Sequence, residues 1–164
     1  MTPLPPNARK YMLTALDVNP VLLDHLLGGL AESSPVWDFR PDPTRFTLRE
    51  MTAHLADWEV IFLERATRMR QEDGPFLPDI DEGQIAEERG YSRLSPQESL
   101  RRFREGRARQ TAFLRSLSDA EWERPGMREL VGAVSIGGQT AMVLGHDGYH
   151  LGQALEWLRA FGAA

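Results

Sequence analysis

Histidine is the residue type in this sequence best placed to do chemistry, because the 164-residue chain contains four histidines and no cysteine. His146 and His150 stand four residues apart in a segment with helical apolar spacing, so their side chains should share one helix face. That spacing allows one helix to supply two nitrogen ligands to a divalent metal ion such as zinc or nickel. The pattern is weak by itself, since it arises by chance in many helices.

A third histidine strengthens the metal interpretation. His54 lies in the apolar stripe of a second predicted helix, where a lone histidine is more often a hydrogen-bonded core residue than a ligand. Combined with His146 and His150 on another inward face, it is better interpreted as the third ligand. Three neutral imidazoles with an open position are typical of a catalytic metal centre rather than a closed structural one. We expect His25, which flanks several leucines, to lie on the surface.

The helix that carries the histidine pair also predicts a pocket. Within about 60° of His146 on a helical wheel the side chains are partly apolar and partly hydrogen-bonding, as in a pocket wall. They are Gln139, Met142, Tyr149, Gln153 and Trp157. Three glycines in the same helix predict that a backbone or ligand approaches closely, because each weakens an exposed helix by about 1 kcal/mol relative to alanine. They are Gly145, Gly148 and Gly152.

Three residues beside the histidines are predicted to assist catalysis. Asp57 follows His54 by three residues, and Tyr149 and Gln153 lie on the face of the histidine pair. Asp57 or Asp147 could alternatively orient an imidazole from behind it, and a solvated carboxylate is an equally good interpretation of either. Glu59 lies about 140° from His54 on the wheel, so we do not expect it in the site.

Four long helices must position these residues, and we expect them at 8–30, 47–72, 95–117 and 135–161. Helix-start signals support the boundaries: Thr47 with Glu50 and Ser95 with Glu98 form capping boxes, and a Ser118 cap begins a short turn. Pro20 either kinks the first helix or marks the true start of its second half. We find no convincing strand and predict a single all-α domain over residues 1–164, an antiparallel four-helix bundle.

The segment 74–94 is long for a connection and is rich in acidic residues, glycine and proline. It could hold a short helix at 82–89. Loops of this length in compact domains are often functional, so we expect it to shape the substrate pocket.

Composition excludes several classes of function. The net charge of −5 argues against nonspecific nucleic-acid binding, and the arginines at 101–109 are interspersed with glutamate as on a solvated helix face. No stretch approaches the ~20 apolar residues that span a bilayer, and Met1 to Pro6 lacks a signal-peptide pattern. We therefore expect a cytoplasmic protein with a small-molecule substrate and no nucleic-acid or membrane partner.

The sequence resembles the DinB-like superfamily, also called the YfiT-like metal-dependent hydrolases. The resemblance rests on the segment from His54 to Glu59 (HLADWE) and the segment from His146 to Gln153 (HDGYHLGQ). The acidic linker ending at Tyr91 and the turn from Ser118 to Trp122 are also similar to family features. The similarity runs from about Leu13 to Leu158, and the pair of motifs in this order is fairly specific.

The resemblance implies an up-down-down-up four-helix bundle with one divalent metal ion, commonly nickel or zinc, bound by His54, His146 and His150. It further implies frequent homodimers. Some relatives are transferases or isomerases that depend on a low-molecular-weight thiol, while many have no assigned activity.

Three functional hypotheses remain open from the sequence. The first is an enzyme in which the metal activates water, as a hydrolase, or a low-molecular-weight thiol, as a thiol S-transferase, with Arg65 or Arg68 at the pocket mouth. The second is a noncatalytic metal-binding module, dimeric or partner-binding, in which the metal adds folding energy. The third is a bundle without metal whose histidines are hydrogen-bonded in the core. We favour the enzyme.

Overall fold

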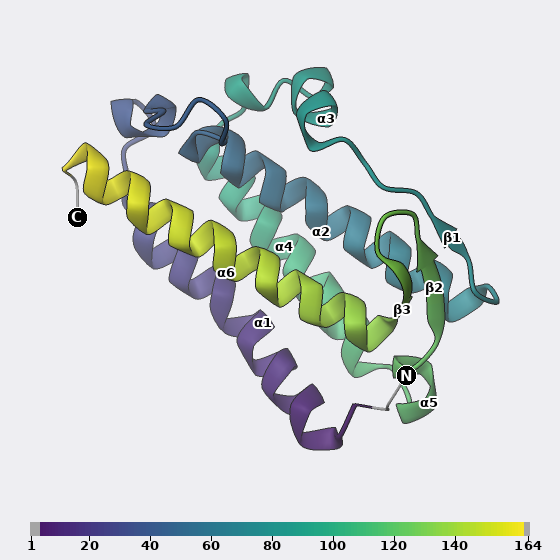
Figure 1. The fold of residues 1–164 in the computed structure, drawn as a ribbon. Helices are drawn as coiled ribbons and strands as arrows, with labels where there is room; N and C mark the ends of the chain where they lie inside the picture. Colours follow the sequence, from purple (N-terminus) through teal and green to yellow (C-terminus); the bar gives the residue numbers. More distant parts are fainter. Residues whose placement is uncertain (1–3, 163–164) are drawn as a thin grey trace.

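Four long helices form the body of the molecule in a computed structural model that describes residues 4–162 (Figure 1). They are α1 (Pro6–Leu27), α2 (Leu48–Gln71), α4 (Pro96–Arg115) and α6 (Ile136–Phe161). Helices α1 and α6 run in one direction and α2 and α4 in the other, with α2 packed most extensively against α4 (Figure 1). The predicted four-helix bundle is confirmed, and so is its up-down-down-up order.

The long connections carry several short elements. They are the 3-10 turns at Pro35–Asp38 and Tyr91–Arg93, helix α3 (Glu82–Glu88) and helix α5 (Asp119–Trp122). The short helix expected at 82–89 is therefore confirmed. After α2 the chain returns along the length of that helix before it enters α4, because parallel neighbours cannot be joined by a tight turn (Figure 1).

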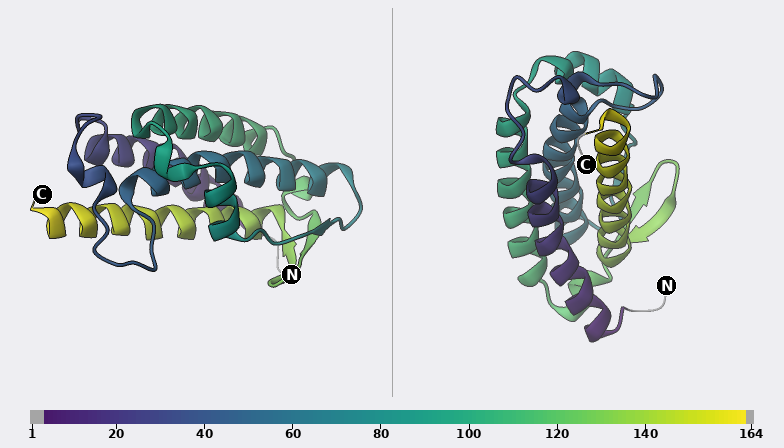
Figure 2. Two further views of the ribbon diagram at one scale, coloured as in Figure 1. Left: turned by 90° about the horizontal axis from the view of Figure 1, so that it is seen from above. Right: turned by 90° about the vertical axis from the view of Figure 1, so that its left-hand side faces the viewer.

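A small sheet is present that the sequence did not predict. Strands β1 (Phe76–Leu77), β2 (Pro125–Arg128) and β3 (Gly132–Ser135) lie in that order, with β1 parallel to β2 and β2 antiparallel to β3. Strands of two to four residues are too short to show the period-two alternation that identifies a strand. The β2–β3 hairpin turns with Gly132 at a φ of 83° and projects beside the start of α6 (Figure 2).

Local signals set the helix ends as expected. The Thr47 hydroxyl accepts from the Glu50 N–H while the Glu50 carboxylate accepts from the Thr47 N–H, a complete capping box at the start of α2. Helix α6 begins where the Ser135 hydroxyl accepts from the Gly138 N–H. Helix α1 continues through Pro20, so this residue does not begin a separate helix.

The apolar core falls into two clusters along the bundle. One contains Trp58, Phe62 and Trp122, and the other contains Trp37, Met51 and Trp157. Within the described part of the chain, no helix is both long and apolar enough to cross a membrane.

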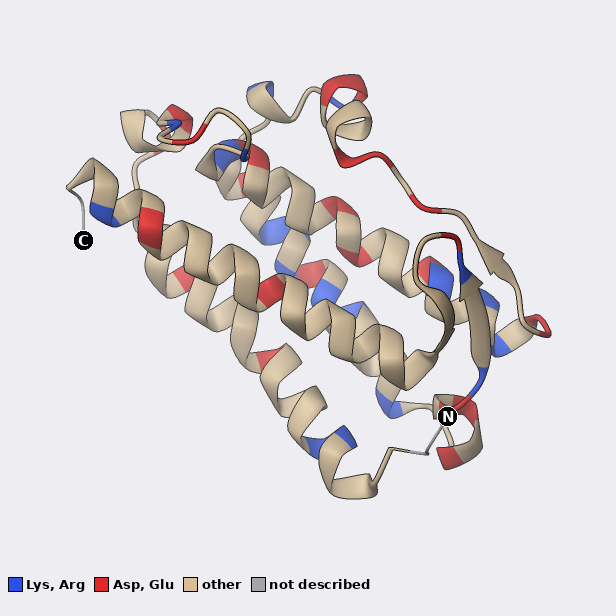
Figure 3. Ribbon diagram, in the orientation of Figure 1, with Lys and Arg blue, Asp and Glu red and all other residues tan. Residues whose placement is uncertain are grey.

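An ion cluster between these apolar regions joins all four long helices at Arg107 of α4, whose side chain is 2% exposed. Its guanidinium donates to Glu59 of α2 at 2.6 and 2.9 Å and to Asp147 of α6 at 2.7 and 3.0 Å. It also donates to the Leu16 carbonyl of α1 at 3.2 Å, so all five N–H groups have an acceptor. Asp147 is one of only three charged residues in α6, with Glu156 and Arg159 (Figure 3).

The cluster holds two buried carboxylates but only one guanidinium. A buried carboxylate without a counter-ion lowers the stability of the fold strongly. Burial raises the pKa of Glu59 to about 7, and the ion pair with Arg107 offsets only part of that effect. Arg107 is therefore required to keep both carboxylates in the interior.

Replacing this guanidinium should destabilise the bundle severely. We expect Arg107→Met to lower the free energy of unfolding by about 3–5 kcal/mol at neutral pH, because two buried carboxylates lose their counter-ion. Arg104→Met is the matched control, since Arg104 pairs with Asp24 on the surface and should contribute less than about 1 kcal/mol. Urea unfolding measures both, and equal losses in the two variants would contradict a special role for Arg107.

Candidate metal centre

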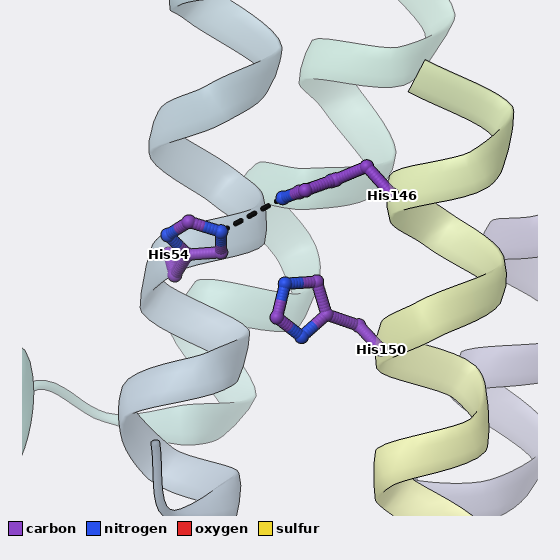
Figure 4. A group of neighbouring side chains, drawn as sticks. All are labelled: His54, His146 and His150. Carbon is purple, nitrogen blue, oxygen red and sulfur yellow. Dashed lines mark hydrogen bonds between the residues drawn. The ribbon is translucent and has the colours of Figure 1, made fainter. Parts of the chain in front are cut away.

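Three imidazoles from two antiparallel helices converge in the interior of the bundle. His54 projects from α2, and His146 and His150 project from successive turns of α6 into the same space (Figure 4). The Nε2 atoms of His54 and His146 are 2.8 Å apart. One ligand atom from each of the three residues lies within 4.8 Å of the other two. The structure thus brings together the three histidines predicted as ligands.

The donor set fits a divalent metal ion. A Zn–N bond is about 2.0–2.1 Å, so two ligands of one ion lie at most about 4 Å apart, and a small adjustment of the three rings would bring them into range. Within residues 4–162 no carboxylate or further histidine joins the group, so three protein ligands would leave a coordination position open.

Burial keeps the three rings in the form that binds metal. Together with a smaller effect of the neighbouring imidazoles, it lowers the pKa of His54 to about 2 and that of His146 to about 3. Burial also lowers the pKa of His150, against an opposing effect of its hydrogen bond to Gln153. All three histidines are therefore neutral near pH 7, with nitrogen lone pairs available.

Gln153 sets the orientation of His150. Its side-chain oxygen lies 2.9 Å from His150 Nδ1, and because an amide oxygen only accepts, the imidazole proton is assigned to Nδ1. This leaves the Nε2 lone pair of His150 facing the other two rings. The Gln153 amide nitrogen in turn donates to the Phe46 carbonyl at 2.7 Å, as does Trp157 Nε1 at 3.0 Å. Gln153 is thus fixed at both ends.

Aromatic side chains form the inner wall of the centre. The His54 ring lies 4.2 Å from the Trp58 ring and 5.1 Å from the Phe46 ring, and His146 meets the edge of Phe62 at 5.7 Å, between ring centroids. Among the described residues, the buried Nδ1 atoms of His54 and His146 find no hydrogen-bond partner. With Nε2 on a metal ion, the Nδ1–H groups of these two rings would have no acceptor among these residues, unlike that of His150.

An open cavity of about 520 Å³ reaches His146 and His150, while His54 lies behind them and does not line it. His146, His150 and Gln153 line it from α6, while Glu82 and Gly83 at the start of α3 form part of its mouth. The segment 74–94 was expected to shape the pocket, and its short helix does so. The remaining lining residues are Thr44, Arg45, Phe46 and Tyr149.

Asp57 has a different environment from the one expected of a catalytic helper. Its buried carboxylate accepts from Tyr91 Oη at 2.9 Å, from Arg89 at 2.8 Å and from Arg102 at 2.9 Å. These contacts anchor the segment after α3 and helix α4 to α2. Asp57 does not line the cavity, so we do not propose it as a catalytic residue. Its i+3 spacing from His54 predicted correctly that Asp57 faces the interior. The spacing could not show whether the side chain points to the cavity or to the arginines beside α4.

Asp147 and Glu59 also differ from their sequence interpretations. Asp147 is neither a solvated carboxylate nor a partner of an imidazole, because it pairs with Arg107 and accepts from the Asn19 amide. Glu59 stays outside the cavity, as expected, but it belongs to the buried ion cluster. Both carboxylates share the single guanidinium of Arg107, which is remote from them in sequence, so no local pattern could reveal the pairing.

Tyr149 lines the cavity as predicted, and its hydroxyl accepts from Arg45 Nε at 3.0 Å. The cation expected at the mouth is Arg45 rather than Arg65 or Arg68. Arg65 donates to the Pro78 carbonyl and Arg68 pairs with Glu72, both away from this cavity. No sequence pattern pointed to Arg45, since it lies in an irregular connection.

Two further expectations concern residues outside the cavity. His25 is exposed, as predicted. The expected close approach at Gly145, Gly148 and Gly152 is absent from the described structure, because a Cβ at any of them would meet no atom within 4 Å. The glycines lie on the exposed side of α6, and nothing in the structure explains them.

Comparison with known proteins agrees with this architecture. The family model of the DinB superfamily matches residues 15–154, which include all three histidines and Gln153. The chain belongs to the DinB superfamily. Among solved structures, YfiT from Bacillus subtilis superposes with a TM-score of 0.90 at 21% identity, over 100% of this chain and 93% of that one. No curated protein matches the chain.

YfiT is described as a probable metal-dependent hydrolase with an unusual four-helix bundle topology. At this level of identity the similarity establishes the fold. In this bundle α2 packs against α6, which accounts for His54 and His146, 92 residues apart in sequence, coming within hydrogen-bonding distance.

The depressed histidine pKa values predict acid sensitivity of the metal-free protein. The pKa of His146 is 6.5 in the unfolded chain and about 3 in the folded chain. Between these two values only the unfolded chain binds the proton, so the free energy of unfolding decreases as the pH falls. Each such histidine should contribute about 1.4 kcal/mol per pH unit below pH 6.5.

His146→Gln should remove one such contribution. We expect the free energy of unfolding of the metal-free variant to fall less steeply than that of the wild type between pH 6 and 4.5, by about 1.4 kcal/mol per unit. Urea unfolding in the presence of a chelator measures the slopes, and parallel slopes would contradict a neutral, buried His146.

Proposed function

We propose that this protein is a metal-dependent enzyme in which His54, His146 and His150 hold one divalent ion, zinc or nickel. The observation that supports the proposal is the convergence of three neutral imidazoles, two buried and one half-buried, beside an open cavity that His146 and His150 line, with no fourth side-chain ligand within residues 4–162. A bound ion would supply a Lewis acid that lowers the pKa of water or a low-molecular-weight thiol toward neutrality. The substrate is therefore a small molecule that is either hydrolysed or receives the thiol.

The residues of the chain have separate roles in this proposal. Gln153 holds the His150 ring so that its Nε2 faces the open space, and is a positioning residue. The Tyr149 hydroxyl accepts from Arg45, so its own proton remains available to a substrate in the cavity. The rings of Phe46, Trp58 and Phe62 exclude water from the inner side of the histidines.

Metal content tests the centre directly. Tag-free wild-type protein should contain about one zinc or nickel ion per chain, and His146→Ala should lose it because two imidazoles bind such ions weakly. His25→Ala is the matched control, since this histidine is exposed and outside the group. Elemental analysis decides: a wild type that is empty and also fails to take up zinc or nickel would overturn the proposal.

Gln153 provides a finer test of the same centre. Gln153→Leu should weaken metal affinity by about 10–100-fold, because His150 loses the acceptor that fixes its tautomer and orientation. Gln139→Leu is the matched control: this buried amide on the same helix donates to the Phe62 carbonyl and is not hydrogen-bonded to any of the three histidines in the described structure. Competition with a chromophoric chelator gives both affinities. If the two variants lose affinity equally, Gln153 acts through the fold rather than through His150.

A further inference from the structure

Arg45 introduces a fixed positive charge into the cavity of the metal centre. It lies in the connection that precedes α2 and lines the same cavity as His146 and His150. Its guanidinium carbon lies 4.3 Å from the centre of the Trp157 ring and 5.2 Å from that of Tyr149. Arginine held against two aromatic faces has lost much of its rotational freedom before any ligand binds, which reduces the entropic cost of binding.

The hydrogen bonds of Arg45 leave part of its fork unused. Nε donates to Tyr149 Oη at 3.0 Å and Nη1 donates to Glu156 at 2.8 Å. Within residues 4–162 its Nη2 group makes no hydrogen bond. Glu156 neutralises the charge only in part, because its side chain is 60% exposed and the pair is screened by solvent.

The charges around the cavity favour an anion. Imidazole binds a metal as a neutral ligand, so three histidines would leave the full charge of a divalent ion uncompensated. Arg45 adds a further positive charge, while Glu82, which is exposed, is the one carboxylate that the described residues contribute to the cavity lining. A guanidinium with free N–H groups is the side chain best matched to a carboxylate.

We infer that the substrate or cosubstrate of this cavity is a small molecule with a carboxylate, which Arg45 binds through its free Nη2 group while the reacting atom reaches the histidine centre. Arg45 is then the residue that selects anionic ligands. This inference rests on the proposed function, since it assumes that the centre holds an ion with an open position.

The experiment compares two thiols that differ only in charge. 3-Mercaptopropionate and its neutral amide, 3-mercaptopropionamide, are titrated into the cobalt(II)-loaded protein, and the thiolate-to-cobalt absorption gives each dissociation constant. The preference for the carboxylate is the dissociation constant of the amide divided by that of the carboxylate. We expect this preference to be about tenfold or more greater in the wild type than in Arg45→Gln, as for a hydrogen bond between charged groups. Comparing ratios between proteins cancels the intrinsic difference between the two thiols.

Arg40→Gln is the matched control, because Arg40 lies in the same connection, pairs with Glu50 and does not line the cavity. It should retain the preference of the wild type. Arg45→Lys, which keeps the charge but not the planar fork, should retain only part of it. This second variant also covers the case in which Arg45→Gln does not fold.

The outcomes separate the two proposals. If cobalt binds but neither thiol changes the spectrum, the centre has no open position and the proposed function fails. If both thiols bind and the carboxylate preference is unchanged in Arg45→Gln or in Arg45→Lys, the inference fails while the proposed function stands. A loss of preference in Arg40→Gln equal to that in Arg45→Gln would also overturn it, since general charge would then explain the effect.

Discussion

The contact between Arg107 and its two carboxylates is the constraint on which the rest of the structure depends. Glu59 lies five residues after His54, and Asp147 directly follows His146. Because Arg107 binds both, it fixes α2 and α6 relative to each other close to the point where their histidines meet. The apolar clusters supply most of the driving force for packing, but they are compatible with sliding of one helix along another, whereas a bidentate ion pair is not.

The same arrangement separates the roles of adjacent residues on α6. Asp147 faces the ion cluster, while its neighbour His146 faces the metal centre, because successive helix residues point about 100° apart. Two adjacent residues of α6 therefore belong to two different clusters, the ion cluster around Arg107 and the histidine cluster. One is ionic and hydrogen-bonded at every N–H, and the other is neutral and aromatic.

The sequence predicted the features that depend on local pattern. Capping signals and apolar periodicity located the long helices within a few residues, and the histidine spacing identified the three residues that converge. The sheet was missed because its strands are two to four residues long. The arginine partners of Asp57 and Asp147 were not anticipated. Arg102 and Arg107 lie on α4, and the apolar periodicity of that helix does not specify which of its polar residues face α2. Arg45 and the mouth of the cavity depend on an irregular connection, where no period exists to read.

The order of the helices has a consequence for how such a protein can change. Since the consecutive long helices α2 and α4 are parallel, the chain must cross the length of the bundle between them, and the connection 72–95 is long for that reason, whereas the connection 28–47 stays at one end of the bundle (Figure 1). These connections supply Arg45 and Glu82, whereas the histidines come from helices held by the core. Insertions or substitutions in the connections could therefore alter which molecule enters the cavity while the histidine centre and the unfolding free energy stay nearly constant. The residues that would select the ligand thus lie in the connections, and the residues that would hold the metal ion lie in the helices.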